Sequence, residues 1–194
     1  MTAFTERSRR APIHPHLTTR PMAIADLPLS ELLLPELDNE LTITRTVLER
    51  VPDNDPDWKP HPKAFSIAHL AQLVARLPAW VRLTMKETEL DLAPKDGPRF
   101  AGYSNESTAT LLAEFDRNAA DARAVIREAT DADFDVPWTL KQGGAAVLTM
   151  PRYRILRSMV LNHLVHHRAQ LGTYLRIVDV AVPEMYGPTA DTKR

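Results

Sequence analysis

At residues 162–170 the chain reads Asn-His-Leu-Val-His-His-Arg-Ala-Gln, and three of its seven histidines fall within these nine residues. On an α-helix, residues four apart point in directions about 40° apart and lie about 6 Å apart along the axis. His163 and His167 can therefore aim their rings at one point, which is the geometry of two ligands to one metal ion. The spacing indicates a class of site without indicating a substrate.

This stretch belongs to a predicted last helix that opens at Pro151, a residue favoured in a first turn, and continues to about Val178. On a helical wheel, both histidines share a face with the mostly apolar residues Leu156, Met159, Val160, Gln170, Leu171, Tyr174 and Val178. His166 lies on the flank of this face. We expect the three arginines on the far side to be solvated, namely Arg154, Arg157 and Arg168.

Three further amphipathic segments come earlier in the chain. Apolar residues at three- and four-residue spacing predict helices from Ser30 to about Val51, from Phe65 or Ser66 toward Glu89, and from Ser104 or Asn105 to about Thr130. Ser66 is the expected N-cap of the second, and Pro78 predicts a kink within it. Residues 136–149, around Gln142-Gly143-Gly144, predict a small hairpin or an extended loop.

Four such helices predict an all-α fold, an antiparallel four-helix bundle with the hairpin or loop before its last helix. The prolines of residues 1–28 predict an irregular arm, and residues 29–194 are expected to form one domain. Bundles of this kind hold metal and ligand sites between facing helices.

The composition narrows the partners. A formal net charge of -1 over 194 residues gives no general basic surface for nucleic acid. No apolar run approaches the roughly 20 residues of a membrane span. We therefore expect a cytoplasmic protein with no nucleic-acid or membrane partner. The chain has no cysteine, so thiolate ligands and a cysteine nucleophile are excluded, and any metal must be held by nitrogen and oxygen.

The histidine pair has two interpretations. A single inward histidine is usually a hydrogen-bonded core residue. Two imidazoles buried one turn apart are better satisfied by a shared cation, because each unsatisfied group costs about 1–3 kcal/mol. A third ligand must then come from another helix, and His69 is the candidate in the second helix. The remaining histidines lie in proline-rich loops and are expected to be solvated: His14, His16 and His61.

A set of motifs over residues 32–191 resembles the DinB-like superfamily of damage-inducible four-helix-bundle metalloenzymes. The motifs are Leu34-Pro35-Glu36-Leu37-Asp38, Trp58-Lys59-Pro60-His61-Pro62-Lys63, Leu77-Pro78-Ala79-Trp80, Pro137-Trp138-Thr139-Leu140, Thr149-Met150-Pro151-Arg152, the histidine run extended to Leu171, and Tyr186-Gly187-Pro188.

The resemblance implies a divalent cation, zinc or nickel first among the choices, held by one histidine of helix two and by His163 and His167. Relatives place the helix-two histidine where this chain has Leu73, and His69 stands one turn earlier. Three outcomes stay open. In the first, the metal lies closer to His69. In the second, His163 and His167 bind the metal together with water and a group outside the ligand set. In the third, the protein keeps the bundle but no longer binds a metal tightly.

The family also includes transferases that use low-molecular-weight thiols. An open position on the cation would lower the pKa of a bound water or thiol, which predicts a hydrolase or a thiol S-transferase acting on a small molecule. His166, Gln170 and Tyr174 are the candidates for positioning the second reactant. The alternative is a non-catalytic, stress-associated bundle with a degenerate metal site. Phosphate-binding loops, nucleophile elbows and paired Glu-x-x-His motifs are absent from the sequence.

A second stripe of apolar or small residues lies on the back of the last helix. Its members are Leu161, Val165, Ala169 and Gly172. An uncovered stripe of this kind predicts either a homodimer through the last helix or the N-terminal arm packed across it.

Overall fold

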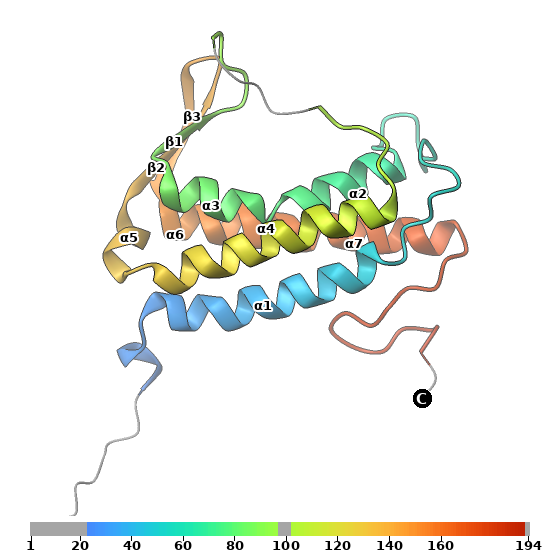
Figure 1. Cartoon of the computed structure of the whole chain (residues 1–194), viewed down its shortest axis with the longest axis horizontal. Helices are drawn as coiled ribbons and strands as arrows, with labels where there is room; N and C mark the ends of the chain where they lie inside the picture. The colour runs from blue at the N-terminus through green and yellow to red at the C-terminus, as the bar shows by residue number, and fades with distance from the viewer. Residues whose placement is uncertain (1–22, 97–101, 193–194) are drawn as a thin grey trace, which may run out of the picture.

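The computed structural model describes residues 23–96 and 102–192, and within them the chain is mostly helical with a small three-stranded sheet. Figure 1 shows the long helices lying side by side, with the sheet rising from one end. The predicted arm at residues 1–28 lies mostly outside the described residues, which begin with a single 3-10 turn, η1 (Ile24–Asp26). None of the described helices is long and apolar enough to cross a membrane.

The first helix, α1 (Leu29–Leu48), forms where leucines recur every three or four residues. Its inward face carries Leu33, Leu37, Leu41 and Leu48, each at most 4% exposed. The predicted end at Val51 is three residues late, because Glu49 already caps the helix and Pro52 follows soon after. This helix packs against α4 and also against α7.

The predicted second helix is two helices, α2 (Ile67–Arg76) and α3 (Ala79–Lys86), separated at Leu77 and Pro78. The expected kink at Pro78 is therefore a break, since proline has no N–H and its ring disfavours a continuous helix. Ser66 is the N-cap, as predicted, and its Oγ accepts from the His69 backbone N–H at 3.3 Å.

The next helix, α4 (Thr108–Glu128), starts later than the sequence suggested. Its N-cap is Ser107, whose Oγ accepts from the Thr110 backbone N–H at 3.2 Å. Ser104 is instead held by the fully buried Gln72, because its backbone N–H donates to Gln72 Oε1 at 2.8 Å. The prediction of Ser104 or Asn105 as the cap was therefore wrong. A short helix, α5 (Asp131–Asp135), follows and was not predicted.

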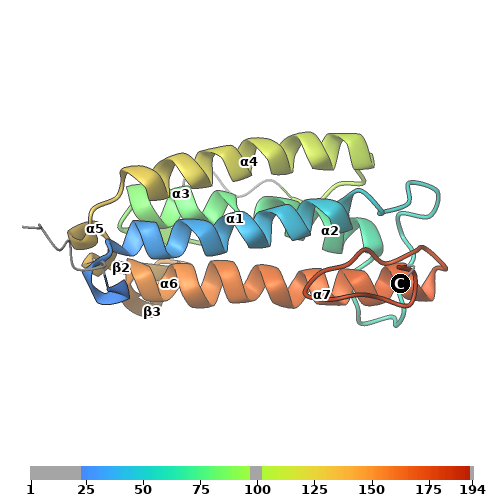
Figure 2. The ribbon, with the colours of Figure 1, turned by 90° about the horizontal axis from the view of Figure 1, so that it is seen from below.

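The last helical segment is continuous but not uniform. It runs through α6 (Arg152–Ile155), a π-helical stretch, η2 (Leu156–Leu161), and α7 (Asn162–Ile177). Figure 2 shows α6 and α7 in one line beneath α1. A π-helical turn is rare and is frequent at functional sites. Here the π-helical stretch ends at Leu161, two residues before His163. The side chains that precede the histidines therefore point in other directions than they would on a straight α-helix.

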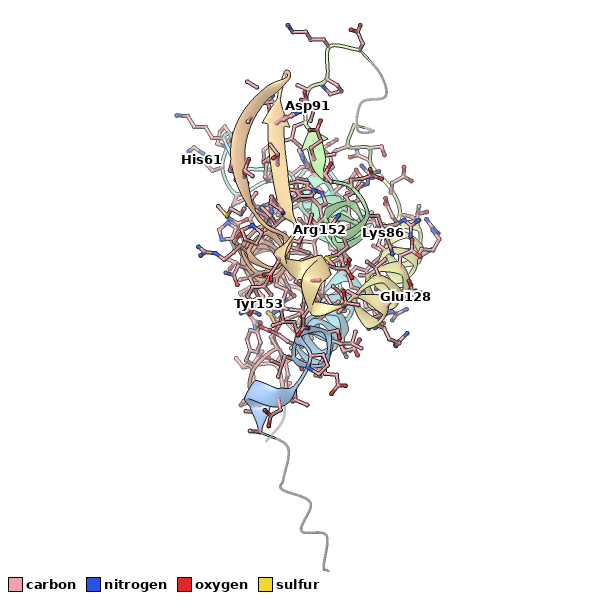
Figure 3. All side chains as sticks on the ribbon, turned by 90° about the vertical axis from the view of Figure 1, so that its left-hand side faces the viewer. His61, Lys86, Asp91, Glu128, Arg152 and Tyr153 are labelled. Atoms are coloured by element: carbon pink, nitrogen blue, oxygen red, sulfur yellow. The ribbon has the colours of Figure 1, made fainter. Side chains whose placement is uncertain are left out.

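The predicted hairpin is present as β2 (Pro137–Gln142) and β3 (Ala145–Pro151), which pair antiparallel around a two-residue turn. Gly143 and Gly144 both have positive φ, which glycine adopts without strain. A further strand, β1 (Glu89–Asp91), was not predicted and pairs parallel with β2. The Asp91 carboxylate accepts from the Gly143 and Gly144 N–H groups, and Figure 3 shows Asp91 beside the hairpin.

Two helices flank α7, and this placement decides the environment of its side chains. It contacts α2 on one side and α1 on another. Beyond α7, residues 178–192 turn back along the molecule toward the C-terminus (Figure 1). Two faces of α7 are therefore covered.

Candidate histidine site and adjoining pocket

The two predicted ligands on α7 meet. The Nε2 atoms of His163 and His167 lie 2.8 Å apart, and their ring centroids are 4.6 Å apart. His167 is 8% exposed, while His163 is partly buried and forms part of a pocket wall. The four-residue spacing thus brings both imidazoles to one point, as the sequence predicted.

Hydrogen bonds at the outer edge of each ring fix its orientation. His167 Nδ1 lies 2.8 Å from Gln170 Oε1, and His163 hydrogen-bonds the backbone carbonyl of Met159, one turn earlier. An amide oxygen and a carbonyl oxygen only accept, so each of these ring nitrogens carries the proton. With those protons in place, both Nε2 atoms present lone pairs to each other, whereas in the other tautomer of either ring the 2.8 Å contact is an N–H···N hydrogen bond. Two facing lone pairs are stabilised by a shared cation, and outer partners of this kind are typical of metal-binding histidines.

The local environment favours the neutral rings. Burial lowers the pKa of both His163 and His167 below the ordinary histidine value, and the nearby His166 lowers both further. Metal coordination requires the neutral imidazole. The environment therefore keeps the lone pairs available near neutral pH.

His69 is not brought to this pair. Its ring stacks between Phe65, at a centroid distance of 4.3 Å, and Tyr103, at 3.8 Å. The Phe65 ring also lies 6.3 Å from that of His167. Among the described residues, no group of three or more His, Asp or Glu side chains is placed to hold a metal ion. Two histidine nitrogens are therefore placed to bind one cation. The described residues do not bring His69 to them as a third ligand.

A pocket adjoins the pair, with a volume of about 460 Å³. It lies against α2, α3 and α4 and reaches His163 on α7. Leu73, where the resemblance described above leads one to expect a histidine, is part of the same wall. An apolar side chain therefore faces the space beside His163.

The three candidate positioning residues have different surroundings. Gln170 contacts the pair directly through His167 Nδ1, so its role is to orient that ring. His166 is exposed, with its ring edge-on to His167 at 4.8 Å. Tyr174 donates its hydroxyl to the Phe65 carbonyl at 3.3 Å and packs edge-on to Trp58, which indicates a structural role. None of these three side chains lines the pocket.

Comparison with known proteins places this geometry in a family. The sequence profile of the DinB superfamily matches residues 36–171, more than half of the chain. The chain belongs to the DinB superfamily. The match runs from α1 to α7, so it includes both histidines of the pair. No curated protein matches the chain significantly.

Two solved structures of DinB-like proteins share the fold. One, from Bacillus cereus, has a TM-score of 0.60 and 21% sequence identity, covering 80% of this chain and 97% of its own. Another, from Bacillus subtilis, has a TM-score of 0.57 and 11% identity, covering 79% of this chain and 97% of its own. At these identities the likeness concerns the DinB-like fold alone.

The run His166-His167-Arg168 contains a buried residue besides His167 that the helical wheel misplaced. Arg168 is 1% exposed, so the prediction that it is solvated was wrong. Its Nη2 lies 2.6 Å from Glu40 Oε2 of α1, and its Nη1 donates to Thr44 Oγ1 at 3.1 Å. The Tyr186 hydroxyl joins the pair, accepting from Arg168 and donating to Glu40 at 2.7 Å. The signal was Glu40 itself, a charged residue within the apolar stripe of α1.

The back of α7 is partly covered by the chain itself. Gly172 is buried beneath residues 178–192, and a Cβ added there would lie 2.9 Å from Met185 Cε. Leu161 is also buried, whereas Val165 is partly buried and Ala169 is exposed. The C-terminal segment thus provides a cover that was not predicted. The homodimer through the last helix stays a prediction.

Proposed function

We propose that this DinB-superfamily chain is a metal-dependent enzyme, of thiol S-transferase or hydrolase type, acting on a small molecule beside His163 and His167. The observation that carries the proposal is the contact between the Nε2 atoms of His163 and His167. The opposite edge of each ring contacts a hydrogen-bond acceptor, which is Gln170 Oε1 for His167 and the Met159 carbonyl for His163. A divalent cation, zinc or nickel, is the proposed partner of those lone pairs. When bound, it would supply Lewis-acid activation of a water or of a low-molecular-weight thiol.

The chain's own residues contribute orientation and a place for the small molecule. Gln170 and the Met159 carbonyl fix the two rings, so little reorganisation is needed when the site is loaded. The pocket holds the small molecule next to His163. In this proposal α1, α2–α3, α4 and α6–α7 are the four members of an antiparallel four-helix bundle. A cytoplasmic location is part of the same proposal.

A second function is favoured by a different observation. Leu73 stands on the pocket wall and His69 is stacked on Phe65 and Tyr103, so no third ligand joins His163 and His167 within the described part of the chain. Catalytic zinc sites usually have three protein ligands. The alternative is therefore a non-catalytic, stress-associated binding protein with a degenerate metal site.

Metal analysis of protein purified without an affinity tag tests the proposal. The wild type should contain about one divalent metal ion per chain, and the His163→Ala, His167→Ala double variant should contain none. His61→Ala, in an exposed loop, and His69→Ala serve as matched controls and should keep the metal. Metal-free wild type, or undiminished metal in the double variant, would overturn the enzyme proposal. A thiol-transfer assay with a small electrophile would then separate transferase from hydrolase.

A further inference from the structure

The pocket beside His163 is mostly apolar. Its walls carry Leu73 and Leu77 from the α2 side, Leu83 from α3 and Leu92 after β1. Two aromatic rings, Trp80 and Tyr103, complete these walls. Its volume of about 460 Å³ is within the range of small-molecule sites. Flat aromatic walls favour a ligand that offers a flat apolar face of its own.

The two charged groups of the pocket are paired with each other. Arg76 Nε lies 2.9 Å from Glu114 Oε1, and both side chains are largely buried, with 28% and 24% exposure. Arg76 also donates to the Gly102 carbonyl at 3.2 Å and stands over the Tyr103 ring at 5.7 Å. A charged ligand would have to compete with this pair or be buried without an opposite charge, and both are costly.

The remaining polar groups are neutral. Asn118 Nδ2 donates to the Ala75 carbonyl at 3.1 Å, which fixes the amide in the wall. His163 lies at the α7 side, beside its partner His167. These groups suit one hydroxyl, amine or carbonyl on an otherwise apolar ligand.

We propose that the pocket binds a small, uncharged aromatic molecule and, since this rests on the function proposed above, that such a molecule is the substrate acted on beside His163. Its ring lies between the leucines and the two aromatic side chains, and its single polar group points to His163. Charge selectivity comes from the Arg76–Glu114 pair, whose opposite charges cancel among the described residues of the wall.

Two fluorescent probes with the same ring system test the charge selectivity. N-phenyl-1-naphthylamine is neutral, and 8-anilinonaphthalene-1-sulfonate carries an added sulfonate. We expect the neutral probe to bind the full chain at least about tenfold more tightly. Glu114→Gln removes the partner of Arg76 and should narrow this difference by strengthening binding of the sulfonate. Equal or tighter binding of the sulfonate by the wild type would overturn the proposal.

The location is tested by filling the pocket. Ala79→Phe places a ring in the wall at the start of α3 and should weaken the neutral probe about tenfold or more. Ala124→Phe, at an exposed position of α4, is the matched control and should have no effect. Circular dichroism and melting temperature confirm that both variants fold. Unchanged binding by folded Ala79→Phe would contradict the proposal.

Competition tests the preference for an aromatic ring. 1-Naphthol should displace the probe at lower concentration than decahydro-1-naphthol, its saturated counterpart, and equal displacement would overturn this preference. All titrations are run in EDTA and again with zinc. If the protein binds the neutral probe but takes up no metal even when zinc is supplied, the enzyme proposal is contradicted and the pocket's ligand class is supported. If the protein takes up zinc but does not bind the neutral probe with or without it, the ligand class is contradicted and the enzyme proposal is left standing.

Discussion

Two polar clusters lie on different sides of α7, and they differ in how their groups are paired. Toward α1, Arg168 meets Glu40, Thr44 and Tyr186, so positive charge, negative charge and hydroxyl satisfy one another. Toward the pocket, His163 and His167 have acceptors at their outer edges and face each other with Nε2 atoms. The first cluster is complete within the chain apart from Arg168 Nε, and the second is where we propose that a cation binds.

The difference separates a structural role from a functional one within five residues of sequence. A buried ion pair joined by hydrogen bonds fixes the packing of α1, α7 and the C-terminal segment. The histidine pair beside the pocket contributes little to the packing of the fold and, in the function proposed above, forms the metal-binding site. Substitutions in the Arg168 cluster should therefore change stability, and substitutions around the histidines should change metal affinity.

The largest effect is expected from Arg168→Met. It leaves the Glu40 carboxylate, 10% exposed, without its partner, and breaking a buried pair in this way costs about 3–5 kcal/mol. Urea denaturation measures the loss. Arg45→Met, in an exposed ion pair with Asp116, is the control and should cost less than about 1 kcal/mol.

The same variant tests the separation of roles. Adding Glu40→Met to Arg168→Met should recover most of the lost stability, because the uncompensated charge is removed. Folded Arg168→Met should keep the metal affinity of the wild type. If Arg168→Met lost less than about 1 kcal/mol of stability, or lost much of the metal affinity, the two clusters would not have separate structural and metal-binding roles.

Leu73→His should strengthen binding at the histidine pair. The new imidazole enters the wall that already contains His163 and supplies the third nitrogen that catalytic zinc sites usually have. Since removing a group that only orients a ligand costs about 10–100-fold in affinity, an added ligand should contribute at least about a hundredfold. Competition with a chromophoric chelator measures the gain. Leu83→His, elsewhere on the same wall, is the control, and equal gains would contradict a specific third position.

Much of the fold was predictable because it depends on local spacing. Leucines at helical intervals predicted α1, Pro78 predicted a kink where the structure has the break between α2 and α3, and Gly143-Gly144 predicted the turn of the hairpin. The start of α4 was missed because Gln72, distant in sequence, takes Ser104 away from a capping role. β1 was missed because a three-residue strand has too little periodicity to recognise.

The site was half predictable for a similar reason. The contact between His163 and His167 follows from four-residue spacing on one helix. The position of the His69 ring depends on its contact with the ring of Tyr103, a residue distant in sequence. Arg168 is buried because α7 packs against both α1 and α2. A helical wheel with a single buried face places Arg168 in solvent. Contacts within one element were thus predicted, and contacts between elements were not.

Gln170→Leu should weaken metal binding without altering the fold. Its amide oxygen holds the Nδ1 side of His167, and losing such a partner costs about 10–100-fold in metal affinity. Because Gln170 is exposed, the melting temperature should change little. Thr173→Val, at an exposed position one turn further along α7, is the control. Unchanged affinity in Gln170→Leu would show that the hydrogen bond does not orient a ligand.

The smallest change in stability is expected in the C-terminal segment, residues 178–192, which covers the Arg168 side of α7. Asp191 pairs with Arg176 and accepts from the Val182 N–H at 2.8 Å, and these contacts lower the pKa of Asp191 below its ordinary value. A lowered pKa in the fold means that the carboxylate stabilises the protein above the unfolded pKa of about 3.9 and loses this contribution as the pH falls through the folded value. The melting temperature of wild type should therefore exceed that of Asp191→Asn near neutral pH, and the gap should close in acid. Asp121→Asn, at an exposed position of α4, should show no such gap. A gap that persists in acid would mean that the segment is held by packing at Met185 and Tyr186 rather than by the Asp191 charge.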